Sequence, residues 1–167
     1  MSTILIYTLL LKNFLMMPTA SPTLHDVRIM YHEASSNDNA CRKLVGILKP
    51  FDEKNSPVLS GYKAGATMMM AKYVFSPFSK ISYFRKGRDM LQKAVNADVH
   101  SIELRFLRFS VQTNLPFFLG YKENINTDKT YILEKLNTIE DVGLKKNIEK
   151  FMKASDYVSD KEKMKLQ

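Results

Sequence analysis

Apolar residues recur every three or four positions along most of this chain of 167 residues, and no stretch alternates convincingly between apolar and polar residues. The first pattern is typical of amphipathic helices and the second of β-strands. One helix is expected around Tyr131 to Leu136, and the others over residues 24–34, 39–49, 57–75, 77–97, 101–114 and 144–154. The sequence therefore predicts an all-α fold.

Residues that favour helix starts stand at several of the expected boundaries. Residues 56–57 and 76–77 are both Ser-Pro, which places a serine at the N-cap and a proline in the first helical turn. Residues 126–128, Asn-Thr-Asp, are expected to cap the helix that carries Tyr131. These local signals support the helical assignment independently of the apolar pattern.

The stretch from residue 83 to residue 119 is expected to organise the fold. It contains two helices joined by a tight corner, and the second helix is apolar on nearly every side. A helix of that kind must be covered on two sides. The sequence therefore predicts stacked antiparallel helical hairpins, as a short α-solenoid-like array or an irregular bundle. The apolar run 117–121 is expected to be tucked against the fold, because exposed aromatic residues in a row would form a sticky patch.

The first helix of this stretch carries a family-like pattern, YFRKGRDMLQKAVNAD over residues 83–98. The positions that carry it are Gly87, Met90, Leu91, Ala94, Ala97 and Asp98. In this order of small, aliphatic and acidic residues the helix resembles the second helix of a tetratricopeptide-type repeat, although Val99 stands where that family has a proline. The resemblance covers one helix and implies a stack of helical hairpins that binds a protein or a peptide.

Residues 1–20 differ in composition from the rest of the chain. An apolar run is followed by Pro18 and Ala20, which fit a signal-peptide cleavage site before Ser21. A downstream translation start and a buried N-terminal helix stay open as alternatives, because Lys12 interrupts the run. The segment is too short for a stable transmembrane span, which needs about 20 apolar residues. We expect an exported protein, periplasmic or secreted, if this segment is a signal peptide, and a cytoplasmic one otherwise.

The rest of the chain is expected to form a single helical domain over residues 21–155, followed by a charged C-terminal tail over residues 156–167. The apolar fraction of 45% and the charged fraction of 25% are ordinary for one globular domain. Cys41 is the single cysteine, so no intramolecular disulfide can form.

The formal net charge of +8 raises the possibility of an acidic partner. The local excess lies between residues 80 and 108, and it consists of Arg85, Lys86, Arg88, Lys93, Arg105 and Arg108. We interpret this set as a solvated helix face, because no nucleic-acid-binding motif accompanies the charge. A nucleic acid is therefore not the expected partner.

The sequence lacks the usual motifs of catalysis and cofactor binding. It has no glycine-rich phosphate loop, no Walker sequence and no Gly-X-Ser-X-Gly nucleophile turn. His25 and His32 are seven residues apart, which separates them by roughly 10 Å along a helix, too far for one metal ion. Neither a metal nor a cofactor is expected.

Three charged residues interrupt the apolar helix at 101–114, namely Glu103, Arg105 and Arg108. Buried charges are costly unless they are paired. One interpretation is an interhelical salt bridge in which Glu103 pairs with Arg85 or Arg88. The other is a concave surface that presents Arg105 and Arg108 with Tyr83 to an anion or a peptide, since a guanidinium suits carboxylate recognition. The candidate binding residues are Tyr83, Arg85, Arg88, Glu103, Arg105 and Arg108.

From these observations we expect a non-enzymatic, exported helical protein that binds another protein or a peptide, as a scaffold or adaptor does. The alternative is an enzyme or a small-ligand-binding protein with a site between helices around Glu103, Arg105 and Arg108. A closed pocket with converging polar groups would favour the alternative, and a broad open groove would favour the first hypothesis.

Overall fold

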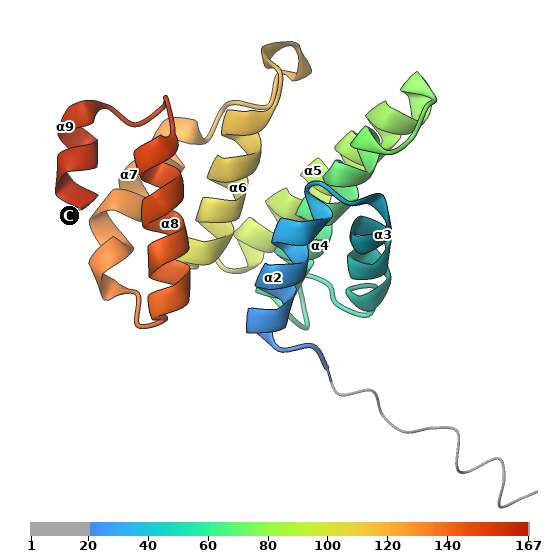
Figure 1. The fold of residues 1–167 in the computed structure, drawn as a ribbon, viewed down its shortest axis with the longest axis horizontal. Helices are drawn as coiled ribbons and strands as arrows, with labels where there is room; N and C mark the ends of the chain where they lie inside the picture. The colour runs from blue at the N-terminus through green and yellow to red at the C-terminus, as the bar shows by residue number, and fades with distance from the viewer. Residues whose placement is uncertain (1–20, 167) are drawn as a thin grey trace, which may run out of the picture.

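The computed structural model describes residues 21–166, and the regular structure in this range is entirely helical (Figure 1). The longer helices are α2 (Leu24–Ala34), α3 (Asp38–Ile47), α4 (Pro57–Met69), α5 (Pro77–Ala97), α6 (Ile102–Asn114), α7 (Ile125–Lys135) and α8 (Val142–Ala154). The shorter ones are η1 (Met70–Lys72), η2 (Phe117–Leu119), η3 (Leu136–Thr138), α9 (Asp160–Lys163) and η4 (Met164–Leu166). The predicted all-α fold is confirmed.

Helices α2 to α5 pack around a first hydrophobic core. Small residues allow these helices to approach closely. A Cβ placed on Gly87 of α5 would lie 2.6 Å from the carbonyl oxygen of Ala64 on α4, and a Cβ on Gly65 of α4 would overlap the ring of Tyr31 on α2. Because each glycine lacks the atom that would clash, α4 can contact both neighbours without a gap.

Helices α7, α8 and α9 pack around a second hydrophobic core, whose fully buried members include Ile132, Ile148 and Met152. The charged segment over residues 156–166 folds back onto this core. Val158 and Leu166 are both buried there. These two apolar side chains and a salt bridge between Glu162 and Lys129 hold the mainly charged segment against the domain.

Helix α6 stands between the two cores, with α2 to α5 on one side and α7 to α9 on the other (Figure 1). Leu104 and Leu107 belong to the first core, and Phe109 belongs to the second. This division explains why the sequence of α6 is apolar on nearly every side.

Several of the expected boundaries differ from the structure, and two of the differences change how the helices are held. The helix expected over 57–75 ends at Met69, and the chain continues as the 3-10 turn η1. Tyr73, just beyond η1, donates a hydrogen bond from its hydroxyl to the carbonyl oxygen of Ala34 at 2.9 Å, so this end is tied to α2. The expected cap at 126–128 is wrong, because α7 begins at Ile125 and Asp128 is fully buried.

The prediction that residues 117–121 are tucked against the fold is wrong for its first two aromatic side chains. Phe117 and Phe118 are 87% and 83% exposed, whereas Tyr121 is 5% exposed. Gly120 adopts the left-handed conformation with φ 61°, which lets the chain reverse after η2. The reversal brings Tyr121 to the core and leaves the two phenylalanines outside.

The predicted signal peptide lies outside the described residues. Within residues 21–166, no helix is both long enough and apolar enough to cross a membrane.

Candidate functional site

The candidate site was expected on α6, and the structure shows how this helix holds its charged residues. The hydroxyl of Ser101 accepts a hydrogen bond from the backbone N–H of Leu104 at 3.2 Å and so caps the helix. Glu103 is 7% exposed and Arg108 is 4% exposed. Both charges must therefore have partners within the fold.

Glu103 is bound by two side chains from other helices. Arg28 of α2 donates to both carboxylate oxygens, from Nε to Oε1 at 2.7 Å and from Nη2 to Oε2 at 2.9 Å. The hydroxyl of Tyr62 on α4 donates to Oε1 at 2.6 Å. Arg28 also reaches Asp141, the N-cap of α8, with 2.6 Å between Nη1 and Oδ2. We call these four residues the Glu103 network; it joins α2, α4, α6 and α8.

An interhelical salt bridge was one of the two interpretations of Glu103, and the structure contains one with a different partner. Its partner is Arg28, 75 residues earlier in the sequence, and neither Arg85 nor Arg88. Arg28 directly follows the fully buried Val27 on α2, so it lies beside the apolar face of that helix. This placement makes Arg28 a candidate partner, but Arg85 follows the buried Phe84 in the same way, so the sequence does not distinguish the two.

The charge states of three partners in the Glu103 network, Arg28, Tyr62 and Asp141, are fixed near neutral pH. The hydrogen bond to Glu103 raises the pKa of Arg28 above its ordinary value. Burial, followed by the neighbouring Glu103 carboxylate, raises the pKa of Tyr62 well above its usual range, so the phenol stays protonated and donates. The backbone N–H of Leu144, followed by the Arg28 guanidinium, lowers the pKa of Asp141. None of Arg28, Tyr62 and Asp141 is therefore poised to exchange a proton near pH 7.

Arg108 and Arg105 both bind the carboxylate of Asp128 on α7, which is fully buried. Arg108 contacts both oxygens, from Nε at 2.7 Å and from Nη2 at 2.8 Å, and donates from Nη1 to Oε1 of Gln92 at 3.1 Å. Arg105 donates from Nη1 to Oδ1 of Asp128 at 3.1 Å and from Nε to the carbonyl oxygen of Val99 at 2.9 Å. We call this set the Asp128 network.

Asp128 was missed as a pairing residue, although its sequence neighbours mark its position. Ile125 precedes it by three positions and Ile132 follows it by four, so all three share one face of α7. Both isoleucines are buried in the second core. An acidic residue on the buried face of a helix requires a cationic partner.

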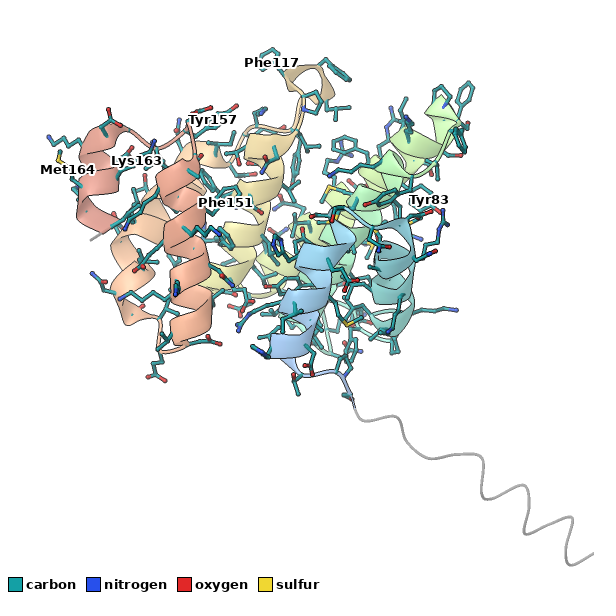
Figure 2. The ribbon with its side chains drawn as sticks, viewed as in Figure 1. Tyr83, Phe117, Phe151, Tyr157, Lys163 and Met164 are labelled. Atoms are coloured by element: carbon teal, nitrogen blue, oxygen red, sulfur yellow. The ribbon has the colours of Figure 1, made fainter. Side chains whose placement is uncertain are left out.

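The structure does not bring the six predicted binding residues together. Glu103 lies in one network, while Arg105 and Arg108 lie in the other. Tyr83 is half-buried against the first core and lies on the side of the molecule away from α7 and α8 (Figure 2). The remaining two arginines, Arg85 and Arg88, are on α5, where Arg85 is exposed and Arg88 forms a salt bridge with its neighbour Asp89 at 2.8 Å.

One of these residues also faces an open depression on the surface of α6 and α7. The guanidinium of Arg105 lies over the ring of Tyr131, 4.3 Å from its centroid, and the Tyr131 hydroxyl donates to the carbonyl oxygen of His100 at 3.1 Å. The depression is lined by Arg105, Asn126, Thr127, Thr130, Tyr131 and Glu134. We call it the α6–α7 depression. It is open, its lining residues are all polar or charged, and it does not enclose a small molecule.

Among residues 21–166, no three histidine, cysteine, aspartate or glutamate side chains converge in a way that could hold a metal ion. Cys41 is buried, its Sγ donates to the carbonyl oxygen of Ala66 at 3.3 Å, and burial raises its pKa to about 11. Its thiol is therefore protonated and internally bonded.

In comparisons with known proteins, no family model, curated protein or solved structure matches this chain.

Proposed function

We propose that this chain is a non-enzymatic, exported helical protein that binds another protein or a peptide through the α6–α7 depression. The observation that carries the proposal is the Arg105 guanidinium stacked on Tyr131 at the edge of an open, polar surface. Arginine and tyrosine are the residue types that contribute most to protein–protein interfaces.

The chemistry of the depression suits an extended polypeptide segment. Asn126, Thr127 and Thr130 are exposed along one side of α7 and offer both hydrogen-bond donors and acceptors. Arg105 uses Nε and Nη1 within the fold, and Nη2 makes no hydrogen bond to a described residue. A peptide carries a main-chain carbonyl group at every residue and can accept from such a nitrogen. Arg105 therefore gives the depression an expected preference for main-chain carbonyl oxygens, and the neighbouring Glu134 carboxylate disfavours an acidic ligand.

The arrangement of the helices supports the same proposal. Gly87 of the segment that resembles a tetratricopeptide helix packs directly against α4, as a stack of hairpins requires. The alternative hypothesis of an enzymatic or small-ligand site needs Glu103 and Arg108 as available groups. Both are occupied by partners within the fold, so the geometry favours binding of a macromolecule at the surface.

The binding proposal is tested by photo-cross-linking in cells that express the full chain. A photoreactive amino acid is placed at Thr130 inside the depression, and at the exposed Asn147 on α8 as a matched control. We expect one discrete cross-linked polypeptide from position 130 and none from position 147. The substitution Thr127→Trp fills the depression without touching the core and should abolish the product. Equal cross-linking at both positions, or a product that survives Thr127→Trp, would contradict the proposal.

Export has a separate test. The intact mass of the protein is measured after isolation from the extracytoplasmic fraction, and a chain that begins at Ser21 is the expected result. Protein found only in the cytosol with residues 1–20 retained would contradict this part of the proposal and leave the binding proposal standing.

A further inference from the structure

Four phenylalanines form the most exposed apolar feature of residues 21–166. Phe75 is fully exposed and Phe78 is 86% exposed, at the start of α5. Phe117 and Phe118 in η2 are 87% and 83% exposed. We call the first pair the α5 tip and the second pair the η2 tip. Large apolar side chains exposed to this degree in clusters mark interaction surfaces.

The two tips lie at the same end of the molecule. In Figure 1 the start of α5 and the η2 turn form the two uppermost points of the fold, and Figure 2 shows Phe117 at this outer limit. A flat surface placed across this end would therefore touch both tips at once. The intervening elements lie below them in the view, so neither tip shields the other from such a surface.

The chain segments that carry the tips contain few acidic residues. No acidic residue occurs between Glu53 and Asp89, whereas this stretch contains Lys54, Lys63, Lys72, Lys80, Arg85, Lys86 and Arg88. Lys72 and Lys80 flank the α5 tip and are exposed. The stretch that contains the η2 tip is likewise free of acidic residues between Glu103 and Glu123. Lys72 and Lys80 thus place positive charge beside the α5 tip, although Asp38 lies near Tyr73 and Glu123 lies near Tyr121.

We propose that the two tips form a docking surface for an anionic lipid membrane. The phenylalanine rings insert to the depth of the boundary between head groups and acyl chains, while Lys72, Lys80 and Arg85 contact anionic head groups. The protein rests on the membrane through the tips and does not cross it. This surface shares no residue with the α6–α7 depression, so the proposal does not depend on the proposed protein partner.

A membrane fits these features better than a folded protein partner does. The tips are separate projections that come from segments about 40 residues apart, and their apolar side chains are all phenyl rings. A rigid protein would need two apolar pockets at matching spacing, whereas a lipid surface deforms and accepts rings at any spacing. The basic residues beside the α5 tip add attraction to an anionic surface over about a Debye length.

The proposal is tested by sedimentation of the full chain with lipid vesicles. One set contains phosphatidylcholine alone, and the other contains phosphatidylcholine mixed with phosphatidylglycerol. The variants Phe75→Ser/Phe78→Ser and Phe117→Ser/Phe118→Ser each remove one tip. Val142→Ser is the control for loss of exposed apolar surface, because Val142 is 78% exposed on α8. Residues 1–20 are the same in every variant, so any difference between variants belongs to the substituted positions.

We expect binding to the anionic vesicles to exceed binding to the neutral ones and to weaken as salt is raised. Each tip variant should lower the partition coefficient by about tenfold or more, and Val142→Ser should leave it unchanged. Lys80→Glu should weaken binding to the anionic vesicles more than Lys153→Glu does, since Lys153 is on α8. Unchanged melting curves would show that the tip variants still fold.

Three results would overturn the proposal. The first is binding that is equal for the wild type and both tip variants. The second is equal affinity for neutral and anionic vesicles. The third is a tip variant with unaltered vesicle binding that changes another property. A change in oligomeric mass would assign the tips to contact with a second copy of the chain, and loss of a cross-linked protein would assign them to another protein.

Discussion

The helices on the two sides of α6 are held together by different kinds of contact. On the side of α2 to α5, helices approach closely at small residues, as Gly87 does against Ala64 and Gly65 does against Tyr31. On the side of α7 to α9, α6 contacts its neighbours through larger groups. Phe106 and Phe109 meet Phe151 of α8 edge to face, with ring centroids 5.4 and 6.1 Å apart. The buried Asp128 network adds an ionic contact to α7.

This difference affects how each side should respond to substitution. A close glycine contact is sensitive to added volume, because backbone atoms stand where a new methyl group would go. A buried ion pair is sensitive to the loss of either partner, because the remaining charge keeps its desolvation cost. The Glu103 network connects the two sides, since it reaches α2, α4 and the N-cap of α8. Substitutions of one residue on each side, and of Glu103 between them, therefore test the comparison.

The largest effect is expected for Asp128→Ala. It leaves the guanidinium of Arg108 buried without a carboxylate and removes one partner of Arg105. Breaking a buried pair by removing one partner costs about 3–5 kcal/mol. Urea unfolding should report a loss of this size, and hydrogen exchange should show the greatest loss of protection in α7. The exposed Asp156 is the matched control, and its alanine variant should change the free energy of unfolding by less than about 0.5 kcal/mol. A loss below about 1 kcal/mol for Asp128→Ala would contradict this account of the second side.

The next effect is expected for Glu103→Gln, which preserves size and removes the charge. The amide nitrogen of glutamine cannot accept from Arg28, and one of the two hydrogen bonds to Arg28 is lost. Hydrogen bonds to charged groups contribute about 1.5–3 kcal/mol, and we expect a loss in this range by urea unfolding. Combining the change with Arg28→Met should cost less than the sum of the single variants. Strict additivity would show that the pair is not coupled.

A smaller effect is expected for Gly87→Ala on the first side. Alanine favours the helix by about 1 kcal/mol relative to glycine. Its methyl group, however, would stand 2.6 Å from the Ala64 carbonyl oxygen. Overpacking of this kind costs about 1–3 kcal/mol. The net expectation is a destabilisation of up to about 2 kcal/mol in urea unfolding. Gly46 on α3 is the matched control, because a Cβ there has no neighbour within 4 Å. Gly46→Ala should stabilise the protein. If Gly87→Ala also stabilised it, the close contact at Gly87 would not be a feature that distinguishes the first side.

The sequence was most informative where one segment determined its own structure. Helix α5 has the predicted bounds, Pro77 to Ala97, because residues 76–77 start it through local capping and the chain's own propensity extends it. The central position of α6 was also predictable, since a helix without a polar face must be covered on two sides. Both predictions depend on residues close together in the sequence.

The sequence was least informative where two distant segments meet. The pairing of Glu103 with Arg28 joins positions 75 residues apart, and no local pattern distinguishes Arg28 from Arg85 as the partner. The outward direction of Phe117 and Phe118 depends on the reversal at Gly120 and on the absence of a described element above η2. Composition alone suggested that aromatic residues in a row would be buried. Only the placement of the helices shows that Tyr121 is buried and that Phe117 and Phe118 are exposed.

The smallest effect concerns the segment that closes the second side. Glu162 accepts hydrogen bonds from the backbone N–H and the hydroxyl of Ser159 and forms a salt bridge with Lys129 at 3.1 Å. The bonds from Ser159, followed by the one from Lys129, lower the pKa of Glu162 to about 2. Because the folded pKa lies below the unfolded value, the stabilisation is complete above about pH 4.5 and is lost as the pH falls through about 2.

Glu162→Gln isolates this charge, because glutamine can still complete the capping box with Ser159. The carboxylate lies near solvent, so screening limits the expected loss to less than about 1 kcal/mol at neutral pH. The difference between wild type and variant in urea unfolding should shrink as the pH falls from about 5 toward 2. Glu140 makes no side-chain hydrogen bond to a described residue, and Glu140→Gln should show no such trend. If the free energies of unfolding of wild type and Glu162→Gln differed by the same amount across this range, the charge of Glu162 would not help to hold the C-terminal segment. Val158 and Leu166 would then hold it by burial alone.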